Sequence, residues 1–377
     1  MSKPLVILEM ANNHMGDISH AKKIIKKYSS ITKSYKNIKF ALKFQLRDSK
    51  TFIHKSFFHS NDKQIVRFKS TFLAENNWKN LINFSKKYFD LACTGFDETS
   101  VSKIFKENKF KYVKIASCSA NDWPLIEQIY KCYKKNPKQI FCSLAGLSGD
   151  EIDKVYSFFN NRNVKINFFY CVGIYPTNNN DLNLSYFKYL QEKYGDKIVG
   201  FSTHETADER HSNSVAIGLG VKVFEKHIGL TNKNKNYKLN DYSVGPKDFE
   251  KWLDNINKSI IVYGSIKDRN KNILQERKKL ITFQRGVYVN RDMKKNTDLK
   301  SKDIYFAFPL QKNQLSANEF SKHNNYKLKK NAINDSPILK SNIVIKNNFS
   351  QVKIIRDKIR NFLKNKKIMF PVKPRLE

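Results

Sequence analysis

The chain has 377 residues, of which 40% are hydrophobic, and its 70 Lys and Arg against 34 Asp and Glu give a formal net charge of +36. This length allows a barrel-sized domain of about 250 residues plus a smaller domain, and the apolar content is sufficient for a real core. No stretch approaches the ~20 apolar residues that cross a bilayer, and the apolar run Leu5 to Leu8 is too short for a signal peptide. We therefore expect a soluble protein and exclude a membrane-spanning one.

The positive charge could indicate nucleic acid, an anionic membrane surface or an anionic substrate as the partner. The lysines are scattered with Asn and Ile along the whole chain, which favours compositional drift over a polyanion-binding surface. Neither nucleic acid nor a membrane is therefore the expected partner. The five cysteines form no CxxC pair, and their odd number suits no closed disulfide framework, so we expect a cytoplasmic location.

Short apolar runs alternate with amphipathic helical segments over the first 264 residues. The runs typical of buried strands are Leu5 to Glu9, Phe40 to Gln45, Asp90 to Thr94, Tyr112 to Ser117, Gln139 to Ser143, Ile166 to Cys171, Ile198 to Ser202 and Val223 to His227. The helical patterns are Ile18 to Tyr28, Asn77 to Tyr88, Glu98 to Glu107, Asp122 to Tyr133, Asp150 to Phe159, Ser185 to Tyr194, Asp208 to Leu219 and a closing helix from Pro246 to about Tyr263. These strand and helix repeats, with crossovers long enough for a helix, predict a (β/α)8 TIM barrel over residues 1–264 rather than an open doubly wound sheet.

The pattern changes after Gly264. Residues 265–279 are polar and rich in Lys and Asn, and we expect a linker or irregular connection there. Shorter alternating segments follow and predict a small, mostly β domain over residues 280–346; they are Gly286 to Val289, Ile304 to Pro309 and Ile343 to Ile345, with a turn around Lys294 to Thr297. Residues 347–377 form a basic C-terminal extension in which Val352, Ile355, Ile359 and Phe362 have helical spacing.

Two histidines stand at matching positions on the last two predicted strands. His204 closes the run IVGFSTH and His227 closes VKVFEKH, 23 residues later. Because the carboxyl ends of parallel strands meet at one edge, both imidazoles would emerge together, where a divalent metal could bridge them. A single histidine at a strand end is more often a hydrogen-bonded structural residue, and it is the pairing that favours a metal site.

The same edge collects ammonium, hydroxyl and carboxylate groups. They come from Glu9, Lys43, Lys114, Ser117, Ser143 and Ser202. Lysines and hydroxyls bind phosphate oxygens, and a metal polarises a carbonyl oxygen. This inventory suits a phosphorylated substrate handled beside a metal, although either lysine could instead neutralise a barrel carboxylate.

Eight segments in this order and spacing resemble the sialic-acid synthase family. They are ILEMANNHMGD, LKFQ, TGFDETSV, VKIASCSANDWPLI, CSLAGLS, YCVGIYPT, GFSTHET and VFEKHIGL. The resemblance covers residues 4–345 and includes a C-terminal segment similar to the family's antifreeze-like (SAF) domain. It implies condensation of phosphoenolpyruvate with an aldose, typically an N-acetylated amino sugar, to give a nonulosonic acid and phosphate. It also implies a homodimer in which the small domain caps the partner's barrel.

The resemblance assigns roles to matching positions of this chain. His204 and His227 match the ligands of Mn²⁺ or Mg²⁺, and Glu9 matches a carboxylate near the metal and the sugar that could move a proton. The positions that match phosphoenolpyruvate contacts are Lys43, Thr94, Lys114, Ser117, Ser143 and Ser202, with Gln45 lining the same floor. The remaining substrate-side matches are Asn13 and His14 in the N-H step, and Tyr175 and Asp241 on the sugar side.

The chain departs from the family at four positions, mostly on the sugar side. Ser119 replaces a carboxylate, Gly173 an asparagine, Thr203 an aspartate and Phe308 an arginine that reaches the partner's sugar site. These changes predict an altered sugar pocket and an atypical acceptor, while the phosphate and metal positions are largely retained. The alternatives are an inactive or diverged relative that binds an anionic ligand or nucleic acid, and another metal-dependent aldolase or lyase on the same barrel, marked by a Schiff base at Lys114.

Overall fold

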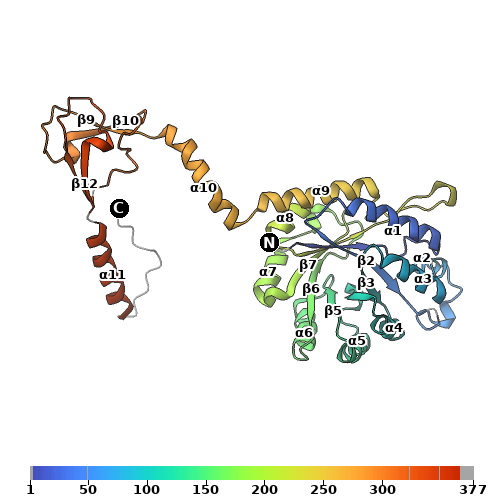
Figure 1. The fold of residues 1–377 in the computed structure, drawn as a ribbon. Coiled ribbons are helices and arrows are strands. Elements are labelled where there is room, and N and C mark those ends of the chain that lie inside the picture. Colours follow the sequence, from blue (N-terminus) through green and yellow to red (C-terminus); the bar gives the residue numbers. More distant parts are fainter. Residues whose placement is uncertain (1–2, 49, 322, 348, 366–377) are drawn as a thin grey trace. The chain divides into compact units, whose positions relative to one another are not determined.

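The structure is a computed structural model that describes residues 3–48, 50–321, 323–347 and 349–365. The chain divides into two compact units, Met1–Gly264 and Ser265–Glu377. Figure 1 shows the strands of the first unit enclosed by its helices. None of the helices in the described ranges is long and apolar enough to cross a membrane.

Eight parallel strands close into a barrel in the first unit, since β1 pairs with both β2 and β8. The strands are β1 (Leu5–Glu9), β2 (Lys39–Leu46), β3 (Asp90–Gly95), β4 (Phe110–Ile115), β5 (Gln139–Ser143), β6 (Ile166–Cys171), β7 (Ile198–Thr203) and β8 (Val223–His227). The predicted (β/α)8 barrel is confirmed, and the predicted strands differ from these only at their ends. Ser117 lies just outside β4, in a short 3-10 turn.

Helices follow the strands in the order that the sequence pattern predicts. They are α1 (Ile18–Thr32), α3 (Glu75–Ser85), α4 (Glu98–Lys106), α5 (Trp123–Lys135), α6 (Gly149–Asn160), α7 (Ser185–Tyr194), α8 (His211–Gly218) and α9 (Pro246–Tyr263). Local capping explains several starts: the Asp17 carboxylate accepts from the Ser19 and His20 N–H groups, and Ser148 and Glu151 form a capping box. An additional helix, α2 (Lys63–Ser70), lies between β2 and α3, where we predicted none.

Successive residues of a strand pack alternately into the interior of the barrel and against the surrounding helices. Leu5 and Ile7 of β1 pack inside the barrel with Ala41, Phe141, Phe169, Val199 and Val223, whereas Val6 and Leu8 pack outward against the helices. The side-chain period of a strand is two, so Glu9 continues the inward row of β1. By the same rule Lys43 follows Ala41 on β2. The apolar interior is thus closed at its carboxyl end by a layer of charged groups.

The second unit is small and mostly β. It pairs β9 (Gly286–Val289) with β10 (Ile304–Ala307), and β11 (Asn324–Leu328) with β12 (Ile343–Asn347), both antiparallel. Its core contains Val287, Val289, Leu299, Leu315, Tyr326, Leu328, Ile338 and Ile343. These hairpins fit the small antifreeze-like (SAF) domain expected from the resemblance, although β11 was not predicted.

The segment after Gly264 differs from our expectation of an irregular connection. Residues Ile266–Leu280 form helix α10, which is capped by Ser265 and buries none of its residues. Lys, Arg, Gln, Glu and Leu dominate this segment and are good helix formers, which explains a helix without an apolar face against a core. Helix α11 (Phe349–Asn365) contains the helical spacing noted at Val352 and Ile359. The rest of the basic extension, 366–377, lies outside the described residues.

Candidate active site

A cavity of about 280 Å³ opens at the carboxyl ends of the barrel strands. Its charged and polar lining includes most of the predicted site residues: Glu9, Lys43, Gln45, Thr94, Lys114, Ser117, Ser143, Tyr175, Ser202, His204 and His227. They come from β1 to β8 and from the loops that follow them. Residues far apart in the sequence therefore share one cavity, as expected for the catalytic end of this fold.

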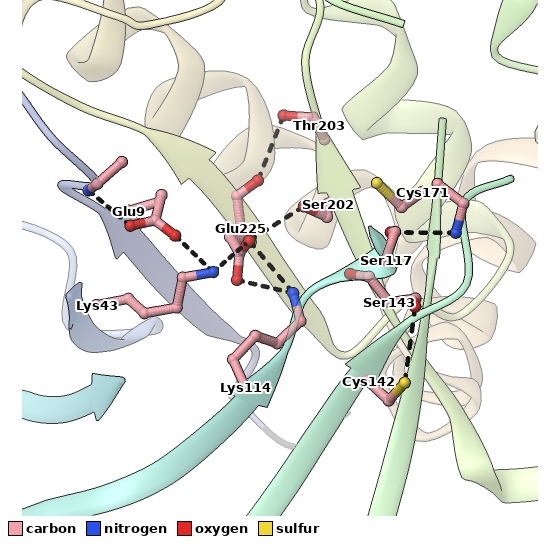
Figure 2. A network of polar contacts seen from close by, with 12 residues as sticks. Glu9, Lys43, Lys114, Ser117, Cys142, Ser143, Cys171, Ser202, Thr203 and Glu225 are labelled. Atoms are coloured by element: carbon pink, nitrogen blue, oxygen red, sulfur yellow. Dashed lines mark hydrogen bonds and ion pairs between the residues drawn. The ribbon is translucent and has the colours of Figure 1, made fainter. Parts of the chain in front are cut away.

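Two lysines and two carboxylates form a buried ion-pair network at the floor of this cavity. Figure 2 shows the Lys43 ammonium between Glu9 and Glu225. Its Nζ lies 2.6 Å from Glu9 Oε2 and 2.8 Å from Glu225 Oε1. The Lys114 Nζ lies 3.1 Å from Glu225 Oε2. Two positive charges thus face two negative charges, so the network is close to neutral before any substrate enters.

The two carboxylates of this network differ in proton affinity. Burial raises the pKa of Glu9, whose ammonium partner, that of Lys43, also pairs with Glu225. Burial opposes ionisation of Glu225 as well, but the ammonium groups of Lys114 and Lys43 lower the pKa of Glu225 well below its ordinary value. Burial lowers the pKa of Lys114. The unequal environments of the two carboxylates shift their pKa values in opposite directions. Glu9, whose pKa is raised, is therefore the carboxylate suited to take up a proton.

Serine hydroxyl groups lie on the Lys114 side of this network (Figure 2). Ser202 Oγ donates to Glu225 Oε1 at 3.2 Å, and Ser117 Oγ accepts from the Ala145 N–H at 3.2 Å. Ser143 and Thr94 are buried and line the same cavity. The backbone N–H contact fixes Ser117 at the cavity wall, so a hydroxyl donor is available there for a ligand oxygen.

The two predicted metal ligands lie side by side, with ring centroids 5.4 Å apart. His204 Nδ1 lies 3.1 Å from the Val172 carbonyl oxygen. Since a carbonyl only accepts, Nδ1 carries the proton and Nε2 is left for a metal. Burial lowers the pKa of His204 to about 4 and that of His227 well below its ordinary value, so both rings are neutral, as metal binding requires.

This donor set fits a divalent ion held by two imidazoles, with the remaining positions supplied by substrate or water. Within the described residues, no group of three or more His, Cys, Asp and Glu side chains is arranged to hold a metal. A protein-only cage is therefore absent from that part of the chain. An open site of this kind is typical of metals that act on a substrate rather than of structural metals.

Tyrosines cover the histidines. The Tyr175 ring centroid lies 4.2 Å from that of His204, and Tyr242 lies 5.1 Å from His227. Both tyrosines line the cavity. Tyr175 was predicted from the sequence. Tyr242 was not, but it directly follows Asp241, which we predicted on the sugar side.

Three predicted substrate-side residues do not line this cavity. Asn13 is buried and donates to the Ile228 carbonyl oxygen at 2.8 Å and to Ser243 at 3.2 Å, so it joins two loops. His14 packs edge-on against Trp78 and lines a neighbouring cavity of about 430 Å³. Asp241 is exposed outside the lining, because the loop turns Tyr242 inward instead. These three residues therefore lie outside the lining of this cavity, and their contact with a substrate stays a prediction.

The departures from the family pattern have separate environments. Ser119 is buried next to Cys118, and Thr203 Oγ1 donates to the Glu225 carbonyl oxygen at 3.4 Å. Gly173 has space at its Cβ position, where the nearest atom is Ala145 Cβ at 3.6 Å. Phe308 is exposed in the second unit. None of the four supplies a charge to the cavity.

Several lining residues were not assigned a role from the sequence. Glu225 stands two residues before His227 on the same strand, and the period of two could have placed both on the inward face. Arg47 and Arg67 come from the segment between β2 and α3, and Tyr242 comes from a loop. Arg47 and Tyr242 lie outside the regular elements, where side chains have no periodicity, and Arg67 lies on α2, a helix that we did not predict, so the sequence carries no comparable signal for these three.

Comparison with known proteins agrees with this architecture. A model of the NeuB family matches residues 31–268. A solved structure of a spore coat polysaccharide biosynthesis protein E from Chromobacterium violaceum has 34% sequence identity and a TM-score of 0.81, covering 91% of this chain and 100% of that chain.

Two curated relatives have named activities. Pseudaminic acid synthase of Campylobacter jejuni is 25% identical over 314 residues, which is 81% of this chain and 88% of that enzyme. N-acetylneuraminate-9-phosphate synthase of Mus musculus is 27% identical over 245 residues, 63% of this chain and 65% of the mouse enzyme. The match to the family spans well over half of the chain and includes the whole strand-end constellation from Lys43 to His227. The chain therefore belongs to the NeuB family of nonulosonic acid synthases.

Proposed function

We propose that this enzyme condenses phosphoenolpyruvate with an aldose, an atypical amino sugar, to form a nonulosonic acid and inorganic phosphate. One observation supports it above all: two lysines, four hydroxyl side chains and two neutral imidazoles line a single cavity at the carboxyl end of the barrel. The relatives named as sialic and pseudaminic acid synthases support the same class of transferase.

In this proposal the floor of the cavity binds phosphoenolpyruvate. Lys43 and Lys114 contribute ammonium groups, while Thr94, Ser117, Ser143 and Ser202 contribute hydroxyls to the phosphate and carboxylate oxygens. Gln45 lines the same floor. The lysines are already paired with Glu9 and Glu225, so binding requires them to redirect hydrogen bonds from a carboxylate to the ligand. Those carboxylates hold the ammonium groups in position until then.

His204 and His227 would hold Mn²⁺ or Mg²⁺ beside this floor. Such an ion, when bound, supplies Lewis-acid polarisation of the aldehyde oxygen of the open-chain sugar. The Val172 carbonyl keeps the His204 ring oriented, and burial keeps both rings unprotonated. Tyr175 and Tyr242 cover the rings on the side from which the sugar would approach.

The proposed reaction joins C3 of phosphoenolpyruvate to the aldehyde carbon of the sugar. A water molecule adds at C2, the bond between C2 and the phosphate oxygen breaks, and phosphate leaves. Glu9 is the group that we assign to proton transfer, because burial raises its pKa toward the range useful in catalysis. The lysines offset the charge on the departing phosphate. Holding both substrates in one cavity supplies the orientation that this condensation lacks in solution.

Two alternatives remain to be separated by experiment. An aldolase that uses a Schiff base would require Lys114 to leave its ion pair with Glu225 and react as a neutral amine; burial lowers its pKa, which favours that form. Borohydride would then trap Lys114 on the substrate. A diverged relative would bind phosphoenolpyruvate or another anion without turnover.

The test is to incubate the protein with phosphoenolpyruvate, Mn²⁺ and a panel of hexoses and amino sugars, and to follow phosphate release. We expect release that depends on one class of sugar, and its loss on treatment with a chelator. His204→Ala and His227→Ala should each abolish turnover and weaken Mn²⁺ binding measured by calorimetry. The matched control is His211→Ala, whose side chain is exposed at the start of α8. Silence across the panel, or full activity in either histidine variant, would refute the proposal.

The homodimer and the cytoplasmic location implied above stay predictions of this proposal. A dimer would be visible by sedimentation velocity, and a monomer at every concentration would argue against the cap supplied by the partner's small domain. All five cysteines are free thiols in the structure.

A further inference from the structure

Two arginines line the cavity without a carboxylate partner. Within the described residues, Glu9 and Glu225 are the carboxylates that line this cavity. Lys43 and Lys114 form ion pairs with them and already neutralise their charges. In the described part of the chain neither Arg47 nor Arg67 has an ion-pair partner. The cavity therefore has two positive charges that no protein carboxylate neutralises. Uncompensated charges in a partly buried site are unfavourable, so they favour an anionic ligand.

Arg47 is held rigidly by aromatic rings. The carbon of its guanidinium group lies 3.8 Å from the ring centroid of Phe96, 4.2 Å from Phe68 and 5.4 Å from Phe52. Its Nη2 donates to Gln45 Oε1 at 3.2 Å, while its Nε is buried with no hydrogen-bond partner. A planar guanidinium fixed in this way is preorganised for bidentate contact with a phosphate or a carboxylate. Burial lowers the pKa of Arg47 to about 10, in agreement with a charge that is poorly compensated.

Arg67 reaches the same cavity from a different element. It lies on α2, and its Nη1 donates to Asn240 Oδ1 at 3.2 Å in the loop after β8. Asn240 is neutral, so this contact orients the guanidinium without cancelling its charge. Two arginines from separate segments thus line one cavity, together with Gln64 and Phe68 of α2.

The position of these arginines separates them from the cavity floor. Lys43 is on the strand β2 itself, whereas Arg47 follows the last residue of β2, Leu46, and Arg67 lies outside the barrel strands. Gln45 stands between Lys43 and Arg47 on the inward row and accepts a hydrogen bond from Arg47. The lysine and hydroxyl floor and the arginine wall are therefore two layers of one cavity, suited to two different anionic groups.

We propose that Arg47 and Arg67 bind an anionic group on the acceptor, so that the acceptor sugar is acidic and carries a phosphate or a carboxylate. This inference rests on the proposed function, in which phosphoenolpyruvate occupies the floor. The arginines then determine specificity, because a neutral sugar would leave two guanidinium groups without a counter-charge.

The experiment compares N-acetylhexosamines with their 6-phosphates and with their C6 carboxylates as acceptors, in the presence of Mn²⁺. Consumption of phosphoenolpyruvate and the mass of the product are measured, since a sugar phosphate could itself release phosphate. We expect kcat/KM for an acidic acceptor to exceed that for the matched neutral sugar by about tenfold or more, the usual effect of a hydrogen bond to a charged group. A preference for the neutral sugar would overturn the inference.

Variants test whether the arginines cause the preference. Arg67→Gln and Arg47→Gln should each reduce the ratio of acidic to neutral kcat/KM and leave the KM for phosphoenolpyruvate unchanged. Because Arg47→Gln could loosen the phenylalanine cluster, the melting temperature of this variant is measured. Arg67, whose guanidinium donates to Asn240, tests the point independently. A raised KM for phosphoenolpyruvate with an unchanged acceptor preference would instead assign the arginines to the first substrate and overturn the inference.

A matched control is Arg162→Gln. The Arg162 guanidinium also stacks on aromatic rings, 3.9 Å from Phe158 and 5.5 Å from Tyr130, but it lies after α6 at the opposite end of the strands and outside the cavity. It should leave the acceptor preference unchanged. If no hexosamine in any form is condensed, the proposed function fails, while calorimetry with hexosamine 6-phosphates still tests the inference. Equal binding by the wild-type protein and both arginine variants would then overturn it.

Discussion

At the scale of single residues, the central feature is a buried set of opposite charges at the cavity floor. Lys43 and Lys114 were predicted as phosphate-binding groups, with neutralisation of a barrel carboxylate as the alternative. The structure shows that they contact carboxylates, and the proposal gives them both roles in turn. Glu225 connects the two lysines, so its removal should reveal how the network is balanced.

We predict that Glu225→Gln destabilises the barrel by about 3–5 kcal/mol, because a buried ammonium loses its carboxylate partner. Phosphoenolpyruvate or inorganic phosphate should then raise the melting temperature of the variant more than that of the wild-type protein, since the ligand replaces the missing negative charge. The control is Glu205→Gln, which breaks another buried pair, with Lys226 at 3.4 Å, outside the cavity lining. Equal ligand-induced shifts in both variants would contradict this explanation.

Most of the residues that line the cavity could be named from the sequence, but their contacts with one another could not. Positions at strand ends, such as Lys43, Ser143 and His227, are predictable because the barrel places every strand end at one rim. The sequence could place Glu225 on the inward face, but it could not predict its ion pairs with Lys43 and Lys114, since these depend on side-chain rotamers across three strands. Arg47 could not be recognised because two of the aromatic residues that hold it, Phe68 and Phe96, are distant in the sequence. The sequence did not distinguish Asp241 from Tyr242, the neighbour that lines the cavity, because a loop, unlike a strand, does not fix which of two neighbours points inward.

At the scale of secondary structure elements, the interior of the barrel is filled tightly enough to require a glycine. A Cβ atom on Gly200 of β7 would lie 2.2 Å from the Phe169 ring of β6. Phe169 belongs to the inner core and also lies under the Lys114 ammonium, 4.5 Å from ring centroid to Nζ. A change at this glycine should therefore be transmitted from the packing of the barrel to the floor of the cavity.

Gly200→Ala should destabilise the first unit by about 1–3 kcal/mol, because the added methyl group overpacks a closed core. Gly218→Ala is the matched control: it lies in α8, no atom is within 4 Å of its Cβ position, and the change should be neutral or stabilising by up to about 1 kcal/mol. Urea unfolding followed by tryptophan fluorescence measures both, since all three tryptophans lie in the first unit. A Gly200→Ala variant as stable as the control would contradict the proposed packing.

The regular elements were predictable for a physical reason. Continuous apolar runs and helical spacing identify strands and helices when both pack against one core, as β5 and α7 do. Helix α10 has no buried residue and therefore no apolar pattern to detect, and α2 buries none of its residues completely. Helices that form by local propensity and capping rather than by burial were therefore the helices missed or taken for irregular chain.

At the scale of the whole molecule, the second unit contains a buried carboxyl group whose ionisation makes the stability of that unit depend on pH. In the second unit Asp303 is buried and accepts hydrogen bonds from Arg291 Nη2 at 2.7 Å and from the Lys300 N–H at 3.1 Å. Burial opposes its charge, but these bonds hold its pKa below the ordinary value. A carboxyl whose pKa is lowered by folding stabilises the folded state above its ordinary pKa of about 3.9, and this contribution is lost as the pH falls.

Asp303→Asn should therefore weaken the second unit at neutral pH and flatten its dependence on pH between about 5 and 3. Hydrogen exchange of peptides from β9 and β10, followed by mass spectrometry, reports on this unit alone, which contains no tryptophan. Asp335→Asn, at an exposed carboxylate that accepts from Tyr305 at 3.0 Å, is the control. Parallel pH profiles for the wild-type protein and Asp303→Asn would show that another group is responsible.

The most direct test of the account as a whole follows the oxygen atoms of the reaction in water labelled with ¹⁸O. The proposed cavity adds water at C2 of phosphoenolpyruvate and breaks the bond between carbon and the phosphate oxygen. We predict that the label appears in the nonulosonic acid product and that the released phosphate carries none. Label in the phosphate, or phosphate release that does not depend on a sugar, would mean that the lysine and histidine cavity performs a different reaction.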